Sequence, residues 1–416
     1  MVKSLPPRTG ADPDALGLSG ERLRAVDRFL QQRYLDTGRL KGCVTLVWRR
    51  GAIAHLSALG QMDAERDRPM RTDTLFRIYS MTKPLTSVAF MMLVEEGLVA
   101  LDDPVSRFIP AWSGLGVHDG GALGGFRTQP PRRPMRIVDL LRHTAGLTYS
   151  FQQQGNIDAA YRALNIGGGE PVGTLDGLIT ALADLPLEFS PGDAWNYSVA
   201  TDVLGYLIGV ISGEPFEDFL RTRLIEPLGM VDTGFFAPPD RVDRLAACYW
   251  LSPQGMTLYD DARTGRYSAP PAFASGGGGL VSTAEDYLQF CRMILGGGAL
   301  DGRRYISPKT LALMAANHLP GGADIKSLSR SMFSEAAYAG IGFGLGFATT
   351  IDAPATLIPG SAGDLFWGGA ASTYFWIDPA EDLAVVFLTQ LAPSTAYPIR
   401  RELRTLVYSA FTEIYG

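Results

Sequence analysis

Apolar residues recur at helical spacing near both ends of the chain, and strand-like runs lie just inside them. Residues 20–35 and 399–414 each place apolar side chains three or four positions apart, which predicts an amphipathic helix at either end. The runs 43–48 and 52–56 flank a turn that ends at Gly51, a pattern typical of a β-hairpin. Such helices need a sheet to cover, and the hairpin supplies its first strands.

Further strands are predicted near the C-terminal end. Residues 340–347 alternate glycine with apolar side chains, which predicts a strand with one apolar face and one bare face. Residues 371–377 and 383–388 are rich in aromatic and β-branched side chains and flank a polar turn. Together these patterns predict an α/β (α+β) fold, in which an antiparallel sheet built from both ends of the chain is flanked by the N- and C-terminal helices.

The middle of the chain is predicted to be mainly helical. Residues 174–186 and 199–212 show helical periodicity, and Pro-Gly turns separate such segments. We therefore expect residues 1–100 and 275–416 to form the sheet domain and residues 101–274 to form an inserted helical domain. The cleft between two such units is a natural place for a substrate.

The candidate chemistry centres on Ser80 and Lys83, three residues apart at the start of a long apolar run. Side chains at this spacing lie on one face of a helix, with Cβ atoms about 5–6 Å apart. Pro84 fits the first turn, where its missing N–H is not needed. A hydroxyl beside an amine is the arrangement of a nucleophile and its activator. A serine that only caps the helix is the simpler alternative.

A tyrosine in the middle of the chain is a candidate partner for this pair. Tyr197 follows the turn at Pro191-Gly192 and precedes the predicted helix 199–212. A tight turn just before a helix can aim one side chain into a cleft, and Tyr197 is the side chain we select. A packing role for Tyr197 is equally compatible with its local sequence.

A glycine pair near the C-terminal end is the third candidate segment. Trp367, Gly368, Gly369 and Ala370 directly precede the strand predicted at 371–377. Paired glycines beside an edge strand let a substrate lie against backbone N–H groups, as an oxyanion hole requires. The alternative is an ordinary glycine bulge with a packed tryptophan.

Histidine and cysteine offer little support for metal chemistry. The chain has four histidines and three cysteines, all widely spaced and without metal-ligand pairs: His55, His118, His143, His318, Cys43, Cys248 and Cys291. We expect no metal, no other cofactor, and reduced thiols. His55 is predicted in a strand and His143 in the last turn of a short helix within 136–147, and structural roles are expected for both.

Charge and composition exclude other classes of protein. The net charge of −6 gives no electrostatic case for a nucleic acid or an anionic membrane as partner. Residues 1–10 contain basic residues but no apolar run, so we expect neither a signal peptide nor a membrane span, and a cytoplasmic location. The glycines 276–279 are not followed by Lys-Ser/Thr, so a nucleotide site is not predicted. An oligomer is possible but nothing in the sequence indicates one.

Taken in order, the three candidate segments resemble the serine β-lactamase and penicillin-binding-protein superfamily. The likeness is greatest to its class C branch and to the family VIII carboxylesterases, and it covers roughly residues 20–412. The residues that carry it are Ser80-x-x-Lys83, Tyr197-Ser198 and Trp367-Gly368-Gly369, with flanking agreement at 75–79, 140–147, Pro191-Gly192 and 279–283.

The resemblance implies a role for each matched residue. Ser80 would be the acylated nucleophile, and Lys83 and Tyr197 would form a coupled proton-transfer pair. The backbone N–H groups of Ser80 and Ala370 would form the oxyanion hole. The segment Trp367-Gly368-Gly369 would contact the substrate.

Two departures from class C β-lactamases favour an esterase. These enzymes carry Tyr-x-Asn where this chain has Val199, and Lys-Thr-Gly where it has Trp367-Gly368-Gly369. Without the amide and the ammonium, recognition of an anionic β-lactam should be weak, and a tryptophan suits an uncharged ester. We expect a serine hydrolase that cleaves short-chain or small hydrophobic carboxylic esters. The alternatives are a β-lactamase or D-amino-acid peptidase, an acyltransferase, and a binding protein without catalysis.

Overall fold

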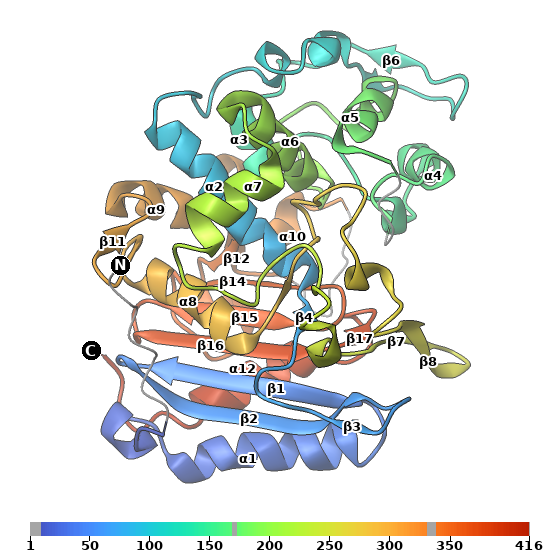
Figure 1. The fold of residues 1–416 in the computed structure, drawn as a ribbon. Helices are drawn as coiled ribbons and strands as arrows, with labels where there is room; N and C mark the ends of the chain where they lie inside the picture. Colours follow the sequence, from blue (N-terminus) through green and yellow to red (C-terminus); the bar gives the residue numbers. More distant parts are fainter. Residues whose placement is uncertain (1–9, 169–172, 331–337, 416) are drawn as a thin grey trace.

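An antiparallel sheet of eight strands forms the centre of the molecule (Figure 1). The computed structural model describes residues 10–168, 173–330 and 338–415. In spatial order the strands are β12 (Ile341–Phe343), β13 (Ala348–Thr350), β14 (Leu365–Gly368), β15 (Tyr374–Asp378), β16 (Leu383–Thr389), β1 (Gly42–Arg49), β2 (Ala52–Asp63) and β3 (Arg68–Pro69). β1 pairs with both β2 and β16, so strands from the two ends of the chain lie side by side, which confirms the predicted fold.

Helices cover both faces of this sheet. The terminal helices α1 (Gly20–Leu30) and α12 (Ile399–Tyr408) pack together on one face, while α2 (Thr82–Glu95) and α8 (Ala284–Leu295) lie on the other (Figure 1). Ser19 directly precedes the apolar spacing of residues 20–35, which predicts it as the cap of α1. The structure confirms this, since the Ser19 hydroxyl accepts a hydrogen bond from the backbone N–H of Arg22 at 3.3 Å. The apolar faces of the terminal helices point into the core, as their spacing predicted.

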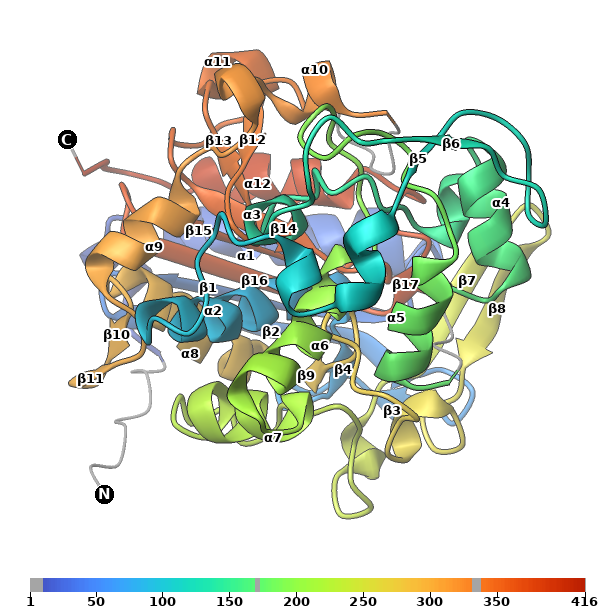
Figure 2. The ribbon, with the colours of Figure 1, turned by 90° about the horizontal axis from the view of Figure 1, so that it is seen from above.

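The helical region packs against α2 rather than directly on the sheet (Figure 2). Its helices are α3 (Ile137–Leu141), α4 (Asn156–Ala163), α5 (Leu175–Ala183), α6 (Ala200–Ser212) and α7 (Phe216–Leu220). α2 touches α6 and α7 and so lies between the sheet and this region. All but one turn of α2 is buried, because its apolar residues extend around the whole helix. The domain boundaries at residues 100 and 275 stay predictions.

Short elements complete the fold and connect its parts. The remaining strands are β4 (Phe76–Arg77), β5 (Val117–His118), β6 (Thr128–Gln129), β7 (Cys248–Ser252), β8 (Gly255–Asp260), β9 (Val281–Ser282), β10 (Ala299–Leu300), β11 (Arg303–Arg304) and β17 (Leu391–Ala392). The remaining helices are α9 (Pro308–Ala315), α10 (Ile325–Leu328) and α11 (Ala353–Thr356). The pairing of β4 with β9 brings the glycine-rich segment before β9 next to the segment that leads into α2.

Residues 340–347 do not form the single strand that their alternation predicted. They contribute β12 and then a turn, in which the N–H of Gly344 donates to the carbonyl of Phe347 at 2.8 Å. Gly346 has a φ of +106°, so the chain reverses there and returns as β13. The glycines therefore make a hairpin rather than one bare strand face.

The glycine pair also lies elsewhere in the sheet than expected. Residues 365–368 form β14, an internal strand between β13 and β15, so no edge strand adjoins the pair. β15 begins at Tyr374 rather than at residue 371. The reason is a turn in which the N–H of Gly369 donates to the carbonyl of Thr373 at 2.9 Å and Ser372 has a φ of +66°.

Ser282 and Glu285 match the Ser-x-x-Glu capping-box pattern, which predicts Ser282 as the N-cap of α8, but the cap is displaced by one residue. Thr283 is the N-cap, and its hydroxyl accepts from the N–H of Asp286 at 3.1 Å. Ser282, the predicted cap, is the last residue of β9, and its hydroxyl lies 2.8 Å from that of Thr233. Strand pairing with β4 occupies its backbone and starts the helix one residue later.

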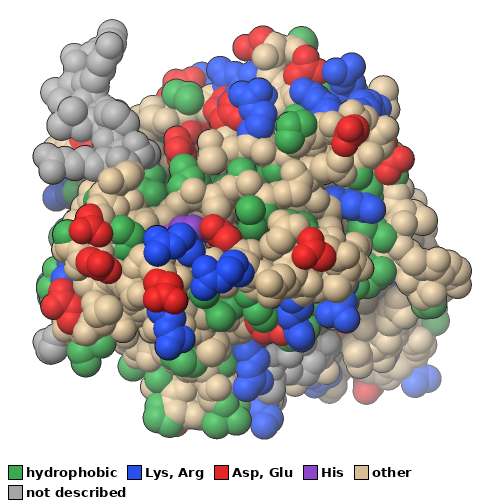
Figure 3. Space-filling model, turned by 90° about the horizontal axis from the view of Figure 1, so that it is seen from below, with side chains coloured by type: hydrophobic (Ala, Val, Ile, Leu, Met, Phe, Trp, Pro, Cys, Tyr) green, Lys and Arg blue, Asp and Glu red, His purple; other side chains and the backbone are tan. Residues whose placement is uncertain are grey.

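Basic and acidic side chains are interspersed on the face that carries α1, with apolar side chains scattered among them (Figure 3). Cys43, Cys248 and Cys291 are buried and free. Among the described helices, none combines the length and the apolar character that a bilayer span requires.

Arg49, at the end of β1, joins both chain ends to the sheet. Its fully buried guanidinium lies 2.7 Å from a carboxylate oxygen of Glu381, and it donates to the carbonyls of Leu16 and Gly17 at 3.2 and 2.8 Å. The neighbouring Arg50 instead pairs with Glu413 at the surface. Arg49 therefore takes part in a buried ion pair, and its neighbour Arg50 takes part in an exposed ion pair.

Substitution of Arg49 by alanine should destabilise the protein strongly. Glu381 would be left buried without its counter-charge, which costs about 3 kcal/mol or more in the free energy of unfolding. Urea denaturation followed by circular dichroism measures this. Arg50→Ala is the matched control and should change stability little. Equal losses in the two variants would contradict the role given to Arg49.

Candidate active site

Ser80 lies in a tight turn where the chain passes from β4 into α2. Tyr79–Met81 form one 3₁₀ turn, and Tyr79 has a φ of +44°, a conformation that tyrosine rarely adopts. The turn leaves Ser80 partly exposed, one helical turn before the buried Lys83. The Lys83 ammonium donates to the Ser80 hydroxyl at 3.1 Å and to the carbonyl of Gly277 at 2.6 Å. The predicted pair is thus in direct contact.

The environment of Lys83 favours its neutral form. Only 1% of the residue is exposed, and burial lowers its pKa to about 7, although the carboxylate of Asp202 opposes this shift. A lysine with this pKa is partly deprotonated at neutral pH. The neutral amine can take the proton of the Ser80 hydroxyl, which makes the hydroxyl nucleophilic.

Tyr197 completes the group from the segment before α6. Its ring centroid lies 4.5 Å from the nitrogen of Lys83. Burial raises the pKa of Tyr197, while the neighbouring hydroxyl of Ser80 and the indole N–H of Trp367 act in the opposite direction. The raised pKa keeps the phenol protonated, so Lys83 is the group able to accept a proton at neutral pH and Tyr197 is able to pass one on.

Trp367 makes a contact that sequence reasoning missed. Its indole N–H donates to the phenol oxygen of Tyr197 at 3.2 Å. The side chain is 3% exposed, because Tyr197 and Phe343 pack against its ring with centroids 5.3 Å away in each case. No local pattern could have shown this contact, since 170 residues separate the two partners.

The end of β14 lies directly against the segment that precedes Ser80. A Cβ on Gly369 would lie 2.4 Å from the carbonyl oxygen of Ile78, so only glycine fits there. The hydroxyl of Thr373 donates to the same carbonyl at 3.3 Å. Within the described chain, the N–H of Ala370 donates to no other residue. The backbone N–H groups of Ser80 and Ala370 therefore lie on adjoining segments, as an oxyanion hole requires.

The predicted substrate segment borders a cavity. Trp367 and Gly368 line a pocket of about 270 Å³ together with Tyr338, Phe366 and Arg400. A Cβ on Gly368 would lie 2.6 Å from the guanidinium of Arg400, so the absence of a side chain at this position makes room for the arginine. Gly368 thus shapes the wall between β14 and α12.

Two aromatic residues extend the site toward solvent. The ring of Tyr149 lies 5.3 Å from the nitrogen of Lys83 and 5.1 Å from the ring of Tyr197. Phe151 stacks on Tyr149 at 4.8 Å and is 50% exposed. Both residues lie shortly after the segment 140–147. The likeness of this segment to the superfamily was the signal in the sequence that could have indicated them.

The histidines do not take part in the proton transfer geometry. His143 lies beyond the end of α3 with a φ of +57°, not in its last turn as predicted. Its Nδ1 is 3.2 Å from the hydroxyl of Ser198, and burial lowers its pKa well below the usual value, so the ring is neutral. His55 lies on β2, 3.0 Å from a carboxylate oxygen of Asp27. Both contacts agree with structural roles.

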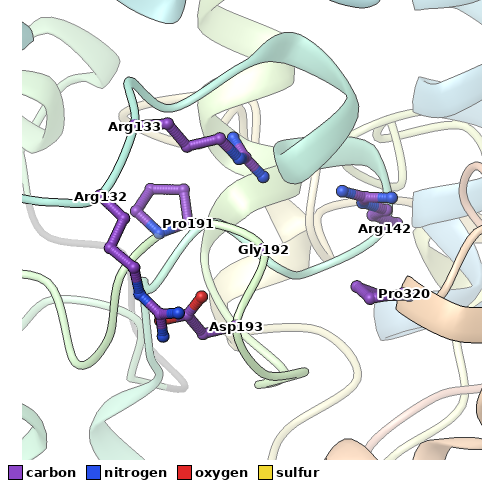
Figure 4. A pocket seen from close by; sticks show the side chains of 7 residues that line it. All are labelled: Arg132, Arg133, Arg142, Pro191, Gly192, Asp193 and Pro320. Carbon is purple, nitrogen blue, oxygen red and sulfur yellow. The ribbon is translucent and has the colours of Figure 1, made fainter.

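An arginine-lined pocket lies behind the turn that leads to Tyr197. It has a volume of about 370 Å³ and is lined by Arg132, Arg133, Arg142, Pro191, Gly192, Asp193 and Pro320. Figure 4 shows Arg132 reaching toward Asp193, and Arg142 across the pocket next to Pro320. Arg133 and Arg142 both pair with the buried Asp139, whose single carboxylate balances one of their two charges. The cluster stabilises the turn. Among the described residues, no group of His, Cys, Asp or Glu could hold a metal ion.

Comparison with known proteins agrees with this geometry. A model of the Beta-lactamase family matches residues 26–409. Protein Rv1367c of Mycobacterium tuberculosis is 40% identical over 86% of this chain and 88% of its own length. Esterase EstB of Burkholderia gladioli is 32% identical over 96% of this chain and 98% of its own length. The solved structure of EstCE1, a hydrolase with promiscuous acyltransferase activity, has a TM-score of 0.79 and 30% identity, and covers 95% of this chain and 99% of its own.

The fold, the family match and the esterase relatives define a serine hydrolase with a β-lactamase fold. The chain belongs to the Beta-lactamase family. The resemblance found in the sequence is thereby confirmed. The contacts of Ser80, Lys83 and Tyr197 are those that a shared acylation chemistry would need.

Phosphonylation of Ser80 should depend on pH as Lys83 titrates. Because its pKa lies at about 7, the reactive neutral amine increases as pH rises, and labelling by a fluorophosphonate probe should be half-maximal near pH 7. In-gel fluorescence against time, from about pH 5 to 9, gives the rates. Lys83→Ala should abolish the pH dependence together with most of the labelling. A rate already maximal at pH 5 would contradict the mechanism.

Trp367→Phe should slow acylation by about tenfold, the effect of one lost hydrogen bond of about 1.4 kcal/mol. The variant keeps an aromatic ring but removes the donor to the Tyr197 oxygen. Stopped-flow measurement of the acylation burst tests this. Trp195→Phe is the matched control, since Trp195 stacks on the ring of Tyr197 at 6.2 Å. The same loss in both variants would assign the effect to packing.

Proposed function

We propose that this protein is a carboxylesterase that cleaves short-chain or small hydrophobic esters through an acyl-enzyme at Ser80. The observation that carries the proposal is the contact of Ser80 with a fully buried lysine whose pKa is close to neutral. This arrangement activates a hydroxyl without an imidazole. The esterase named among the relatives supports an ester as the substrate class.

Acylation begins when Lys83 takes the proton of Ser80 and the serine oxygen attacks the ester carbonyl. The tetrahedral intermediate carries a negative oxygen, which the N–H groups of Ser80 and Ala370 stabilise. Tyr197, whose phenol neighbours the hydroxyl of Ser80, passes the proton from Lys83 to the departing alkoxide. The C–O bond to the alcohol breaks, and the acyl group stays on Ser80.

Deacylation repeats these steps with water as the nucleophile. The same pair removes a proton from water, which attacks the acyl-enzyme, and returns a proton to the oxygen of Ser80. Trp367 holds the phenol of Tyr197 in place through both halves of the reaction. The net reaction consumes one ester and one water and needs no metal or redox partner.

The residues near the site favour an uncharged substrate over a β-lactam. Val199 is 1% exposed, so it offers neither an amide nor an accessible surface at the position where class C enzymes have asparagine. Trp367 donates its side-chain N–H to Tyr197, whereas a lysine there would offer an ammonium to a carboxylate. Anchoring of the amide and the carboxylate of a β-lactam by these two positions is therefore not expected.

Acyl transfer to an alcohol is the second candidate function. It is supported by the solved relative EstCE1, a hydrolase with promiscuous acyltransferase activity. An alcohol would replace water in the second half of the reaction, without any change in the roles of Ser80, Lys83 and Tyr197. Addition of methanol or butanol during ester hydrolysis, with detection of the new ester by gas chromatography, tests this candidate.

The expected substrate preference is a higher kcat/KM for p-nitrophenyl butyrate than for nitrocefin. Ser80→Ala should lower ester turnover by roughly 10³-fold or more, because no other group can carry the acyl chain. Mass spectrometry of the phosphonylated protein should place the adduct on Ser80. Ser198→Ala is the control, since its hydroxyl contacts His143 and not Ser80. A clear preference for nitrocefin, or labelling that persists in Ser80→Ala, would overturn the proposal.

A further inference from the structure

A buried carboxylate, that of Asp202, lies close to Lys83 and is linked to it through Gly277. Asp202 is in the first turn of α6 and is 6% exposed. One of its oxygens, Oδ1, accepts both from the hydroxyl of Ser275 at 2.5 Å and from the N–H of Gly277 at 3.0 Å. Nothing in the local sequence marked this residue, because its partners lie about 75 positions further along the chain.

Gly277 connects this carboxylate to the lysine. Its N–H is bound to Asp202, and its carbonyl accepts from the ammonium of Lys83 at 2.6 Å. A Cβ on Gly277 would lie 2.6 Å from the other oxygen of Asp202 and 3.1 Å from the hydroxyl of Tyr149. A Cβ on Gly276 would lie 2.6 Å from a backbone carbonyl of α6. The glycine run 276–279 therefore lets the chain pass between α2 and α6.

We propose that Asp202 is a positioning residue that holds the amine of Lys83 against Ser80 through Gly277 and sets the pH at which this amine loses its proton. The inference rests on the proposed function, because it assigns Lys83 the proton of Ser80. Asp202 does not touch the substrate. It affects the reaction in two ways, by holding the backbone at Gly277 and by its negative charge.

The other groups around Lys83 supply no compensating charge. The phenols of Tyr149 and Tyr197 face the ammonium, and burial raises the pKa of both, so they are neutral. His143, in the segment after α3, is kept neutral by burial and by the charge of Lys83. The charge of Asp202 raises the pKa of Lys83. Burial raises the pKa of Asp202 itself, while the hydrogen bonds from Ser275 and Gly277 and the charge of Lys83 favour its carboxylate form. The charge of Asp202 thus opposes the effect of burial on the amine.

Asp202→Asn separates the charge from the hydrogen bonds. The asparagine Oδ1 can still accept from Ser275 and Gly277, while the negative charge is lost. The pKa of Lys83 should then fall, so the acid limb of the pH profile should move to lower pH by about one unit. Asp202→Ala removes the acceptor as well, and kcat should fall by about tenfold or more because the Gly277 carbonyl is no longer fixed. The readouts are fluorophosphonate labelling of Ser80 and hydrolysis of p-nitrophenyl butyrate against pH.

Ser275→Ala is the matched control for this experiment. It removes one hydrogen bond and keeps the charge, so the midpoint of its pH profile should stay that of the unsubstituted protein. If Asp202 had only a structural role, the pH profile of Asp202→Asn would coincide with that of the unsubstituted protein. This result would overturn the inference. Absence of labelling at Ser80 in the unsubstituted protein would instead refute the proposed function.

A second measurement applies even where Asp202→Asn folds poorly. In Lys83→Met the carboxylate of Asp202 is buried without its counter-charge, so the added change Asp202→Asn should relieve this cost. The double variant should unfold at a higher temperature than Lys83→Met alone, as followed by differential scanning fluorimetry. A double variant that unfolds at the same temperature or below would show that the two charges are not coupled, and would also overturn the inference.

Discussion

The burial of one ammonium group beside a serine hydroxyl is the constraint on which the site depends. Lys83 is on a helix that is buried around almost its whole circumference, between the sheet and the helical region. Water cannot solvate its charge there, so the neutral amine becomes accessible near neutral pH. A lysine at the same spacing on an exposed helix would stay charged and could not take the proton of Ser80.

Glycines at two positions allow separate segments to meet at Ser80. Gly369 brings the end of β14 against the carbonyl of Ile78, and Gly277 fits between Lys83 and Asp202. In both cases a Cβ would lie closer than 3 Å to a neighbouring oxygen. The geometry of the candidate site is therefore achieved by close backbone approach as much as by the side chains of Ser80, Lys83 and Tyr197.

Periodic patterns of apolar residues predicted the main layers of the fold. The tight turns within these layers were not predicted. α1, α12 and the β1–β2 hairpin follow from apolar spacing, because burial of one face needs only a regular period. The hairpin within 340–350 and the late start of β15 were not predicted. They depend on positive φ values at Gly346 and Ser372, and alternation of side chains does not encode such reversals.

The sequence by itself determined the contact between Ser80 and Lys83, since residues three apart at the start of a helix must lie on one face. It also selected Tyr197, first from the turn at Pro191-Gly192 before a predicted helix and then from the order of the motifs. The tertiary structure alone decided that Trp367 donates to the phenol of Tyr197. It also decided that Asp202 lies near Lys83, bound to the N–H of Gly277. The physical reason is the separation of the partners along the chain. Helix geometry fixes which residues are neighbours within a few positions, whereas these contacts join distant segments that only the packed fold brings together.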